Sequence, residues 1–69
     1  MSDHVYKKIE LVGSSRTSVE DAIQNAISSA STSLNHLDWF EVQEVRGDIK
    51  EGKVGYYQVT LKVGFRLND

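Results

Sequence analysis

Trp39 is the residue of this chain best suited to binding a flat ligand. It lies in the run DWFEVQEV, residues 38–45, where polar and apolar side chains otherwise alternate. Phe40 follows it directly, so in a β-strand one of the two aromatic side chains must lie on each face of the sheet. A protein this small can cover only one face of a strand with its own chain. Periodicity alone leaves two interpretations of Trp39 open: a contact between subunits, or an aromatic plate for a ligand.

No group of residues with the spacing of a catalytic or metal centre accompanies this run. His4 and His36 lie far apart in the sequence and have no partner at a metal-ligand spacing. We therefore predict that both are surface residues and that the protein holds no metal ion. A nucleophile–base pair or a carboxylate pair at a suitable spacing is also missing, so we predict that the protein is not an enzyme.

The composition predicts a small domain that must assemble with copies of itself. The 69 residues, without Cys or Pro, predict a single domain over residues 1–69. A chain of this length buries only about 60% of its unfolded surface. Because disulfides are impossible and a metal is not expected, oligomerisation is the remaining way to stabilise it. We thus expect a homo-oligomer.

The charge pattern and the apolar runs limit the other partners. The formal net charge is −2, with both signs interspersed, which argues against a nucleic-acid partner. No apolar run of about 18 residues is present, so we expect no membrane span. The N-terminus has no apolar stretch of the signal-peptide type. These observations predict a soluble, cytoplasmic protein, and the lack of Cys agrees with a reducing compartment.

A strand and a helix are predicted in the first half of the chain. Residues 4–13 alternate in hydrophobicity and end at a glycine, which predicts a half-buried strand. Thr17 or Ser18 can cap a helix, since Glu20 and Asp21 follow them at capping-box spacing. The helix that follows has a single apolar stripe, made of Val19, Ile23, Ala26, Ile27, Ala30 and Leu34.

Two long strands, residues 38–50 and 53–67, are predicted around a two-residue turn at Glu51-Gly52. This turn sets the register: Val42 pairs with Leu61, Phe40 with Val63, and Asp38 with Phe65. The predicted fold class is α+β, a single β-α-β-β domain. We expect its three-stranded antiparallel sheet to curl around one helix.

The same register predicts a second sheet face that the helix leaves open. Its residues are Trp39, Glu41, Gln43, Val45, Gly47, Ile49, Val54, Tyr56, Gln58, Thr60, Lys62 and Arg66. A solvated face is normally polar throughout, and this mixture of aromatic, aliphatic and polar side chains instead indicates an interface or a ligand platform. Trp39 and Gln58 are about 20 Å apart along the strands. If both contact one ligand, they must come from different subunits.

Three segments together resemble the dodecins, small bacterial and archaeal flavin-binding proteins. They are VYKKIELVG at residues 5–13, LDWFEVQEVRG at 37–47 and YYQVTLKVGFRL at 56–67, in this order and at this spacing. The resemblance spans the whole chain. It implies a hollow dodecamer built from trimers, in which paired flavins are sandwiched between Trp residues of facing subunits.

The resemblance also implies roles for four residues. Trp39 matches the Trp that stacks on the flavin, and Gln58 matches the Gln that hydrogen-bonds the edge of the isoalloxazine ring. Arg46 and Arg66 match basic residues that serve phosphate-bearing ligands. The implied cofactor is a flavin, namely FMN, riboflavin or FAD, with coenzyme A as a further ligand. The predicted register, however, puts Arg46 on the helix face, unless a bulge at Gly47 redirects the strand.

The predicted function is flavin storage and sequestration, with quenching of flavin photochemistry by the stacked indole. The alternative is an oligomeric shell or a coenzyme A-binding module without a flavin role. A flavin enzyme needs room for a substrate over the ring, and a ring between Trp and a second flavin leaves little. Single-stranded RNA binding, the other use of an aromatic sheet, is disfavoured by the acidic balance and the lack of an RNP-type motif.

Overall fold

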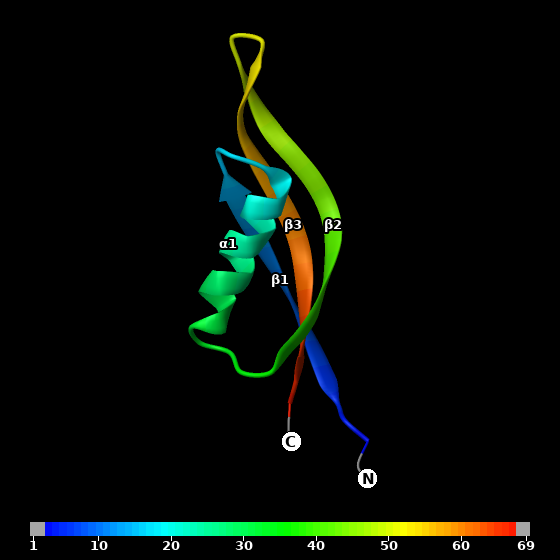
Figure 1. The fold of residues 1–69 in the computed structure, drawn as a ribbon. Coiled ribbons are helices and arrows are strands. Elements are labelled where there is room, and N and C mark those ends of the chain that lie inside the picture. Colours follow the sequence, from blue (N-terminus) through cyan, green and yellow to red (C-terminus); the bar gives the residue numbers. More distant parts are fainter. Residues whose placement is uncertain (1–2, 68–69) are drawn as a thin grey trace.

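The three strands form an antiparallel sheet with one helix packed on one of its faces (Figure 1). The computed structural model describes residues 3–67. The elements follow in the order β1 (Tyr6–Ser15), α1 (Val19–Ser31), β2 (Leu37–Lys50) and β3 (Lys53–Arg66). The sheet order is β1-β3-β2, so β3 is central and pairs with both other strands. The predicted β-α-β-β fold and the antiparallel sheet are confirmed.

The β2–β3 hairpin turns at Glu51-Gly52, as predicted. Both residues have positive φ angles, 54° and 78°, and Lys50 pairs with Lys53. Two successive positive φ angles are typical of the tight turn whose twist matches that of the flanking strands. Each strand is 14 residues long, and the hairpin extends well beyond β1 and α1 (Figure 1).

The N-terminus of α1 is fixed by a hydrogen-bonded group of short side chains. Ser18, rather than Thr17, is the N-cap, and its Oγ accepts from the backbone N–H of Asp21 at 3.0 Å. The buried Ser15 donates from its Oγ to the Asp21 carboxylate at 2.7 Å and accepts the Thr17 N–H at 2.9 Å. These bonds fix the angle at which the helix leaves β1.

The helix ends at Ser31, one turn before the predicted Leu34. There the hydroxyl groups of Ser31 and Thr32 donate to the carbonyl groups of Ile27 and Ser29, both at 2.8 Å. Short hydroxyl side chains that bond to backbone carbonyls in this way compete with the helical pattern. The run of Ser and Thr therefore explains why the apolar stripe continues further than the helix does.

The core is a layer of helix alanines against the central strand. Its members are Ala22, Ala26 and Ala30 of α1 and Val59, Leu61 and Val63 of β3, each 8% exposed or less. Ala22 was not among the predicted stripe residues. A Cβ atom at Gly13 would collide with the carbonyl oxygen of Ala22, so β1 needs a glycine where the helix crosses it. Small residues on both elements thus let the helix approach the sheet closely.

On β2, the side chains that share a face with the buried residues of β3 are not covered by the helix. Phe40, Val42 and Val45 have 47%, 44% and 53% of their surface exposed. Their cross-strand partners on β3 are almost completely buried, namely Val63, Leu61 and Val59. Phe40 lies on the predicted face, but the prediction that its own chain buries it is wrong, because α1 packs on β1 and β3 instead. We call Phe40, Val42 and Val45 the β2 strip.

The chain is elongated for its size. Its radius of gyration is 14.4 Å, whereas a compact domain of this length has about 11 Å. The principal extents are 56 × 20 × 14 Å. The extended hairpin and the half-covered sheet leave apolar side chains of β2 exposed on the surface of the chain.

Irregularities in β2 change the predicted register at three points. The pairs Val42–Leu61 and Phe40–Val63 are confirmed, but Phe65 pairs with Leu37 and not with Asp38. Asp38 and Gln43 are extra residues in β2, and a third shift lies between Asp48 and Ile49 near the hairpin tip. Each extra residue moves the side chains beyond it to the opposite face of the sheet.

Candidate functional site

The sheet face opposite α1, which we call the outer face, carries the predicted site residues. Trp39 pairs with Gly64, Arg46 with Gln58, and Arg66 with Tyr6 of β1. Paired residues of an antiparallel sheet share a face. Trp39, Gln58, Arg46 and Arg66 therefore all lie on the outer face.

The Trp39 side chain lies across the central strand. A Cβ atom at Gly64 would collide with the six-membered ring of the indole, so the ring rests directly on the β3 backbone. The Tyr6 ring meets it edge to face, with centroids 5.1 Å apart and an interplanar angle of 64°. Trp39 nevertheless remains 38% exposed. The indole is thus held from below and from one side and has surface left for a partner.

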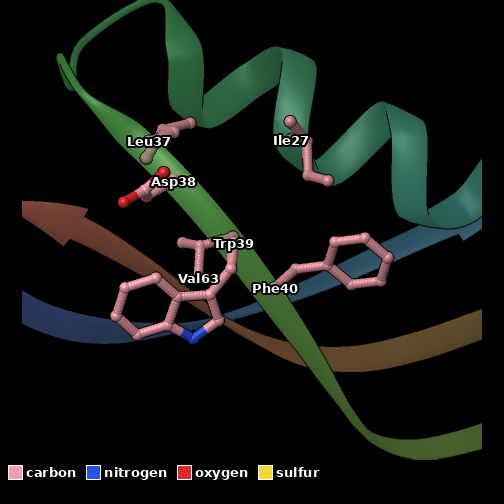
Figure 2. Close-up of a pocket in the computed structure, with 6 residues that line it drawn as sticks. All are labelled: Ile27, Leu37, Asp38, Trp39, Phe40 and Val63. Atoms are coloured by element: carbon pink, nitrogen blue, oxygen red, sulfur yellow. The ribbon is translucent and has the colours of Figure 1, made fainter.

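Figure 2 shows that Trp39 and Phe40 leave β2 in opposite directions. The Phe40 ring borders an apolar groove between β2 and the helix, where Ile27 comes from α1 and Val63 from β3. Trp39 is directed away from the helix. The predicted division of the two aromatic residues between the two faces is confirmed.

An ion pair lies beside Trp39 on the outer face. Lys8 of β1 donates to Oε1 of Glu41 on β2 at 3.0 Å, across the central strand β3. This hydrogen bond and the charge of Lys8 lower the pKa of Glu41 below its ordinary value of 4.5. Both side chains are nearly half exposed, so water and salt screen the pair.

The Lys8–Glu41 ion pair makes the stability of the Trp39 end of the outer face depend on pH in the acidic range. Because the pKa of Glu41 is lowered on folding, the pair stabilises the fold at neutral pH, and this small contribution disappears as the pH falls through the folded-state pKa, below 4.5. We expect a small change in Trp39 fluorescence in this acidic range. Glu41→Gln should abolish it, and an unchanged titration in that variant would contradict the assignment.

Gln58 and Arg46 are neighbours at the other half of the outer face. A register shift between Asp48 and Ile49 makes Arg46 pair with Gln58, and the prediction that Arg46 lies on the helix face is wrong. This irregularity begins at the residue after the suggested Gly47, and the extra residue Gln43 then restores the predicted register for Val42 and Phe40. Gln58 also borders an open groove, which is lined by Ser14, Ser15, Arg16 and Tyr56.

Arg66 lies near the Trp39 end. It is two residues beyond Gly64 on β3, and its guanidinium contacts the ring of His36, with Nη2 3.3 Å from Nδ1. His36 therefore has a partner that its spacing in the sequence does not indicate, although both histidines are exposed, as predicted. The ring of His4, the other histidine, lies edge-on to Tyr6 with centroids 6.3 Å apart.

The structure therefore groups the four predicted site residues into two pairs. Trp39 and Arg66 form the Trp39 end of the outer face, and Gln58 and Arg46 form the Gln58 end. Gly64, the partner of Trp39, is six residues from Gln58 along β3, which corresponds to about 20 Å. Within one chain, a single flavin ring cannot contact both ends.

Tyr6 and Gly64 belong to the site but were not assigned a role from the sequence. The sequence already placed both residues on the outer face, because Tyr6 alternates with the residues on the other side of β1 and Gly64 lies opposite Trp39 in the predicted register. The missing information was the strand order. Only the central position of β3 places β1 and β2 on its two sides, so that Tyr6 reaches Trp39 across Gly64.

Two further findings concern the part of the chain that the structure describes. Residues 3–67 contain no group of three or more side chains that could hold a metal ion. In the same residues, no helix has the length and apolar character needed to cross a membrane.

Fold and face together define a small α+β protomer with an open aromatic sheet face. The family model of dodecins matches residues 5–68. A curated dodecin of Thermus thermophilus is 58% identical over 65 residues, which cover 94% of either chain. The chain belongs to the dodecin family.

Solved structures agree with this assignment. A crystal structure of a Thermus thermophilus protein is 57% identical, with a TM-score of 0.92, and the match covers 97% of this chain and 98% of that one. The dodecin of Streptomyces coelicolor is 51% identical, also with a TM-score of 0.92, over 100% and 99% of the two chains.

Proposed function

We propose that this protein binds flavin at pockets formed between its subunits, and that it stores the flavin in a photochemically quenched form. The observation that carries the proposal is the Trp39 indole, which rests on Gly64, is braced by Tyr6 and remains 38% exposed on the open sheet face. A fixed aromatic plate binds a flat ring by offset stacking. Membership of the dodecin family supports the same function.

The quenching follows from the redox properties of the two rings. Trp39 would supply an electron donor at stacking distance from a photoexcited flavin, and return of the electron to the indole would dissipate the excitation with no net chemistry. A flavin held in this way does not pass its excitation to oxygen.

The polar residues of the site are proposed to select and orient the ligand. The Gln58 amide can both donate to and accept from the ring edge, where a flavin presents carbonyl oxygens, an N–H group and ring nitrogens. The guanidinium groups of Arg46 and Arg66 suit a phosphate, which they can bind through paired N–H donors. We therefore propose FMN as the ligand, with riboflavin and FAD binding less tightly.

Solved variants of a relative support the choice of these residues. Three structures are of single-substitution variants of the Thermus thermophilus dodecin, one with Trp replaced by Phe and two with Arg replaced by Ala. The three substituted positions have the same spacing along that chain as Trp39, Arg46 and Arg66 have along this one.

A binding titration tests the proposal. Flavin fluorescence should fall as protein is added to riboflavin or FMN, and mass spectrometry of the ligand released from purified protein should identify a flavin. A protein that quenches none of riboflavin, FMN and FAD would contradict flavin storage and favour the shell or the coenzyme A-binding module. Turnover of a reductant with bound flavin would favour an enzyme instead.

We further propose that the protein assembles into a hollow dodecamer, and that the β2 strip is covered by a neighbouring copy. Three half-exposed apolar side chains on one edge strand are unfavourable in water, and the described chain covers them only in part. The elongated shape also leaves the hairpin available for contacts with neighbours.

Truncation of Phe40 should weaken this assembly more than the fold of the chain. Phe→Ala costs about 3 to 5 kcal/mol when the ring is fully buried, and here only half of the ring is buried within the chain. We expect light scattering of Phe40→Ala to show dissociation on dilution at concentrations where the unmodified particle is intact.

Leu61→Ala is the matched control, because Leu61 is completely buried within the chain. It should lower the free energy of unfolding by about 2 to 5 kcal/mol. If Phe40→Ala leaves the particle as resistant to dilution as before, the β2 strip is not part of the interface.

A further inference from the structure

His36 is tied to Arg66 through both its backbone and its ring. The Arg66 N–H donates to the His36 carbonyl at 3.1 Å, which extends the β2–β3 ladder one step beyond Leu37 and Phe65. In addition, Nη2 of Arg66 lies 3.3 Å from Nδ1 of His36. The His36 side chain therefore lies at the base of a residue proposed to bind the flavin phosphate.

A hydrogen bond at this contact requires one particular tautomer of the histidine. A guanidinium has only donors, so the His36 Nδ1 must be the acceptor, which requires a neutral ring with its proton on Nε2. One N–H of Nη2 then points at His36. A phosphate held in the bidentate manner uses a different pair of guanidinium donors. The hydrogen bond to His36 can thus orient the guanidinium while a phosphate is bound.

The backbone of His36 restricts the residues that can replace it. Its φ angle of 63° is in the left-handed region, where Gly is unstrained and Asn, Asp and His are the other residues commonly found. Gly would keep this backbone but has no side chain to accept from Arg66. Asn would keep both the left-handed backbone and an acceptor for Arg66, because its Oδ1 is as many bonds from Cα as the histidine Nδ1. These two replacements separate the role of the ring from that of the backbone.

Arg66 in turn belongs to the Trp39 end of the outer face. It pairs with Tyr6, whose ring is 5.1 Å from that of Trp39. The contact with His36 restrains the guanidinium at this end of the face, and a restraint on its rotation reduces the side-chain entropy lost when a phosphate binds. Fixing it in advance improves the affinity for a phosphorylated ligand only.

We propose that His36 is a positioning residue that holds the Arg66 guanidinium for the phosphate of a flavin nucleotide, and so sets the preference for FMN over riboflavin. This inference rests on the proposed flavin-binding function. It assigns His36 no contact with the flavin ring, so the affinity for riboflavin serves as an internal control.

The test compares dissociation constants for FMN and riboflavin at one pH in the wild type, His36→Asn and His36→Gly. We expect His36→Gly to reduce the preference for FMN by about three- to tenfold, the range of one hydrogen bond, and to leave riboflavin binding unchanged. His36→Asn should retain most of the preference. Equal losses for both ligands, or an unchanged preference in His36→Gly, would overturn the proposal.

A double-substitution cycle shows whether His36 acts through Arg66. Arg66→Ala should itself remove most of the preference for FMN. If His36 acts only by holding Arg66, adding His36→Gly to Arg66→Ala should have no further effect on the preference. Full additivity of the two effects would show that His36 acts on the phosphate by another route and would overturn the positioning role.

A measurement without flavin keeps the inference separate from the proposed function. The chain has two histidines, so nitrogen-15 labelling of histidine gives two ring signals, and His36→Asn identifies that of His36. The long-range proton–nitrogen spectrum should show the Nε2–H tautomer, and the Nδ1 signal should shift in Arg66→Ala. An Nδ1–H tautomer, or no shift, would overturn the inference even if flavin binds. Failure of riboflavin to bind the wild type would instead reject the proposed function.

Discussion

Trp39→Ala is expected to fold and assemble but to lose about 1 to 3 kcal/mol of flavin affinity, the range found when an aromatic residue is removed from a stacked base. This corresponds to roughly a 5- to 150-fold rise in the dissociation constant. Trp39 is on the outer face, away from the core of Leu61 and the helix alanines, so its removal leaves no cavity there. Flavin that still binds should be more fluorescent, because the electron donor is gone. Titration of flavin fluorescence measures both effects.

Two variants show whether the ring itself or its placement matters. Trp39→Phe keeps an aromatic plate but has a smaller, less electron-rich ring, so quenching should weaken more than affinity. Gly64→Ala keeps the indole but puts a methyl group where the ring lies, so the indole must tilt or shift. We expect it to weaken flavin binding with Trp39 still present. If Trp39→Ala unfolds the protein, or if affinity and fluorescence do not change, Trp39 is not the flavin plate.

The fold could be predicted because its signals are local in the sequence. The Glu51-Gly52 turn is flanked by two alternating runs, and it fixes the pairing of Lys50 with Lys53 and of Ile49 with Val54. Ser18 and Asp21 mark the start of the helix in the same way, through one turn of backbone. Such features depend on neighbours a few residues away, so a single sequence contains them.

The bulges could not be predicted because they depend on the partner strand. Nothing in the residue types of Asp38 or Gln43 indicates that each is an extra residue opposite β3. Strict alternation therefore placed Arg46 on the wrong face, although Trp39 and Gln58 were placed correctly. The error is confined to the residues between two register shifts, since the extra residue Gln43 reverses the shift at Asp48–Ile49 and restores the predicted pairs of Val42 and Phe40.

The extent of the core could not be predicted either, for a different reason. Periodicity identifies the face on which Phe40 lies, but not whether the single helix is wide enough to cover three strands. The helix packs on β1 and β3, and Gly13 and Ala22 bring it so close to β1 that β2 remains open. Phe40 and Val42 of the predicted core are thus part of the surface of the chain, and they become core only if another subunit covers them.

The position of His36 illustrates a third limit. From the sequence it is a lone histidine with no partner at a useful spacing, and Arg66 is 30 residues away. The two meet because the loop after α1 returns the chain to the end of β3. Contacts between the ends of distant elements follow from topology, and no periodicity within either segment indicates them.

The separation of the two ends of the outer face leads to the strongest test of the shared pocket. Particles that mix chains carrying Trp39→Ala with chains carrying Gln58→Ala should recover tight flavin binding that neither variant has alone. The reason is that Trp39 and Gln58 are about 20 Å apart in one chain, so a ring that contacts both must lie between two chains. With equal and random mixing in a symmetric oligomer, about a quarter of such pockets receive both intact residues. Calorimetric titration should therefore show a tight class of sites only in the mixed particles.

The matched control for this experiment uses Arg46, which pairs with Gln58 and belongs to the same end of the face. Mixing Arg46→Ala with Gln58→Ala chains should restore no tight pocket. Each of these chains lacks one residue of the Gln58 end, so no chain in the mixture supplies a complete Gln58 end. Mixing Arg46→Ala with Trp39→Ala should restore sites as the first mixture does. Recovery in the control, or none in the first mixture after verified co-assembly, would show that the two ends do not serve one ligand. The open face of each chain would then be a subunit contact, the other interpretation that the position of Trp39 allows.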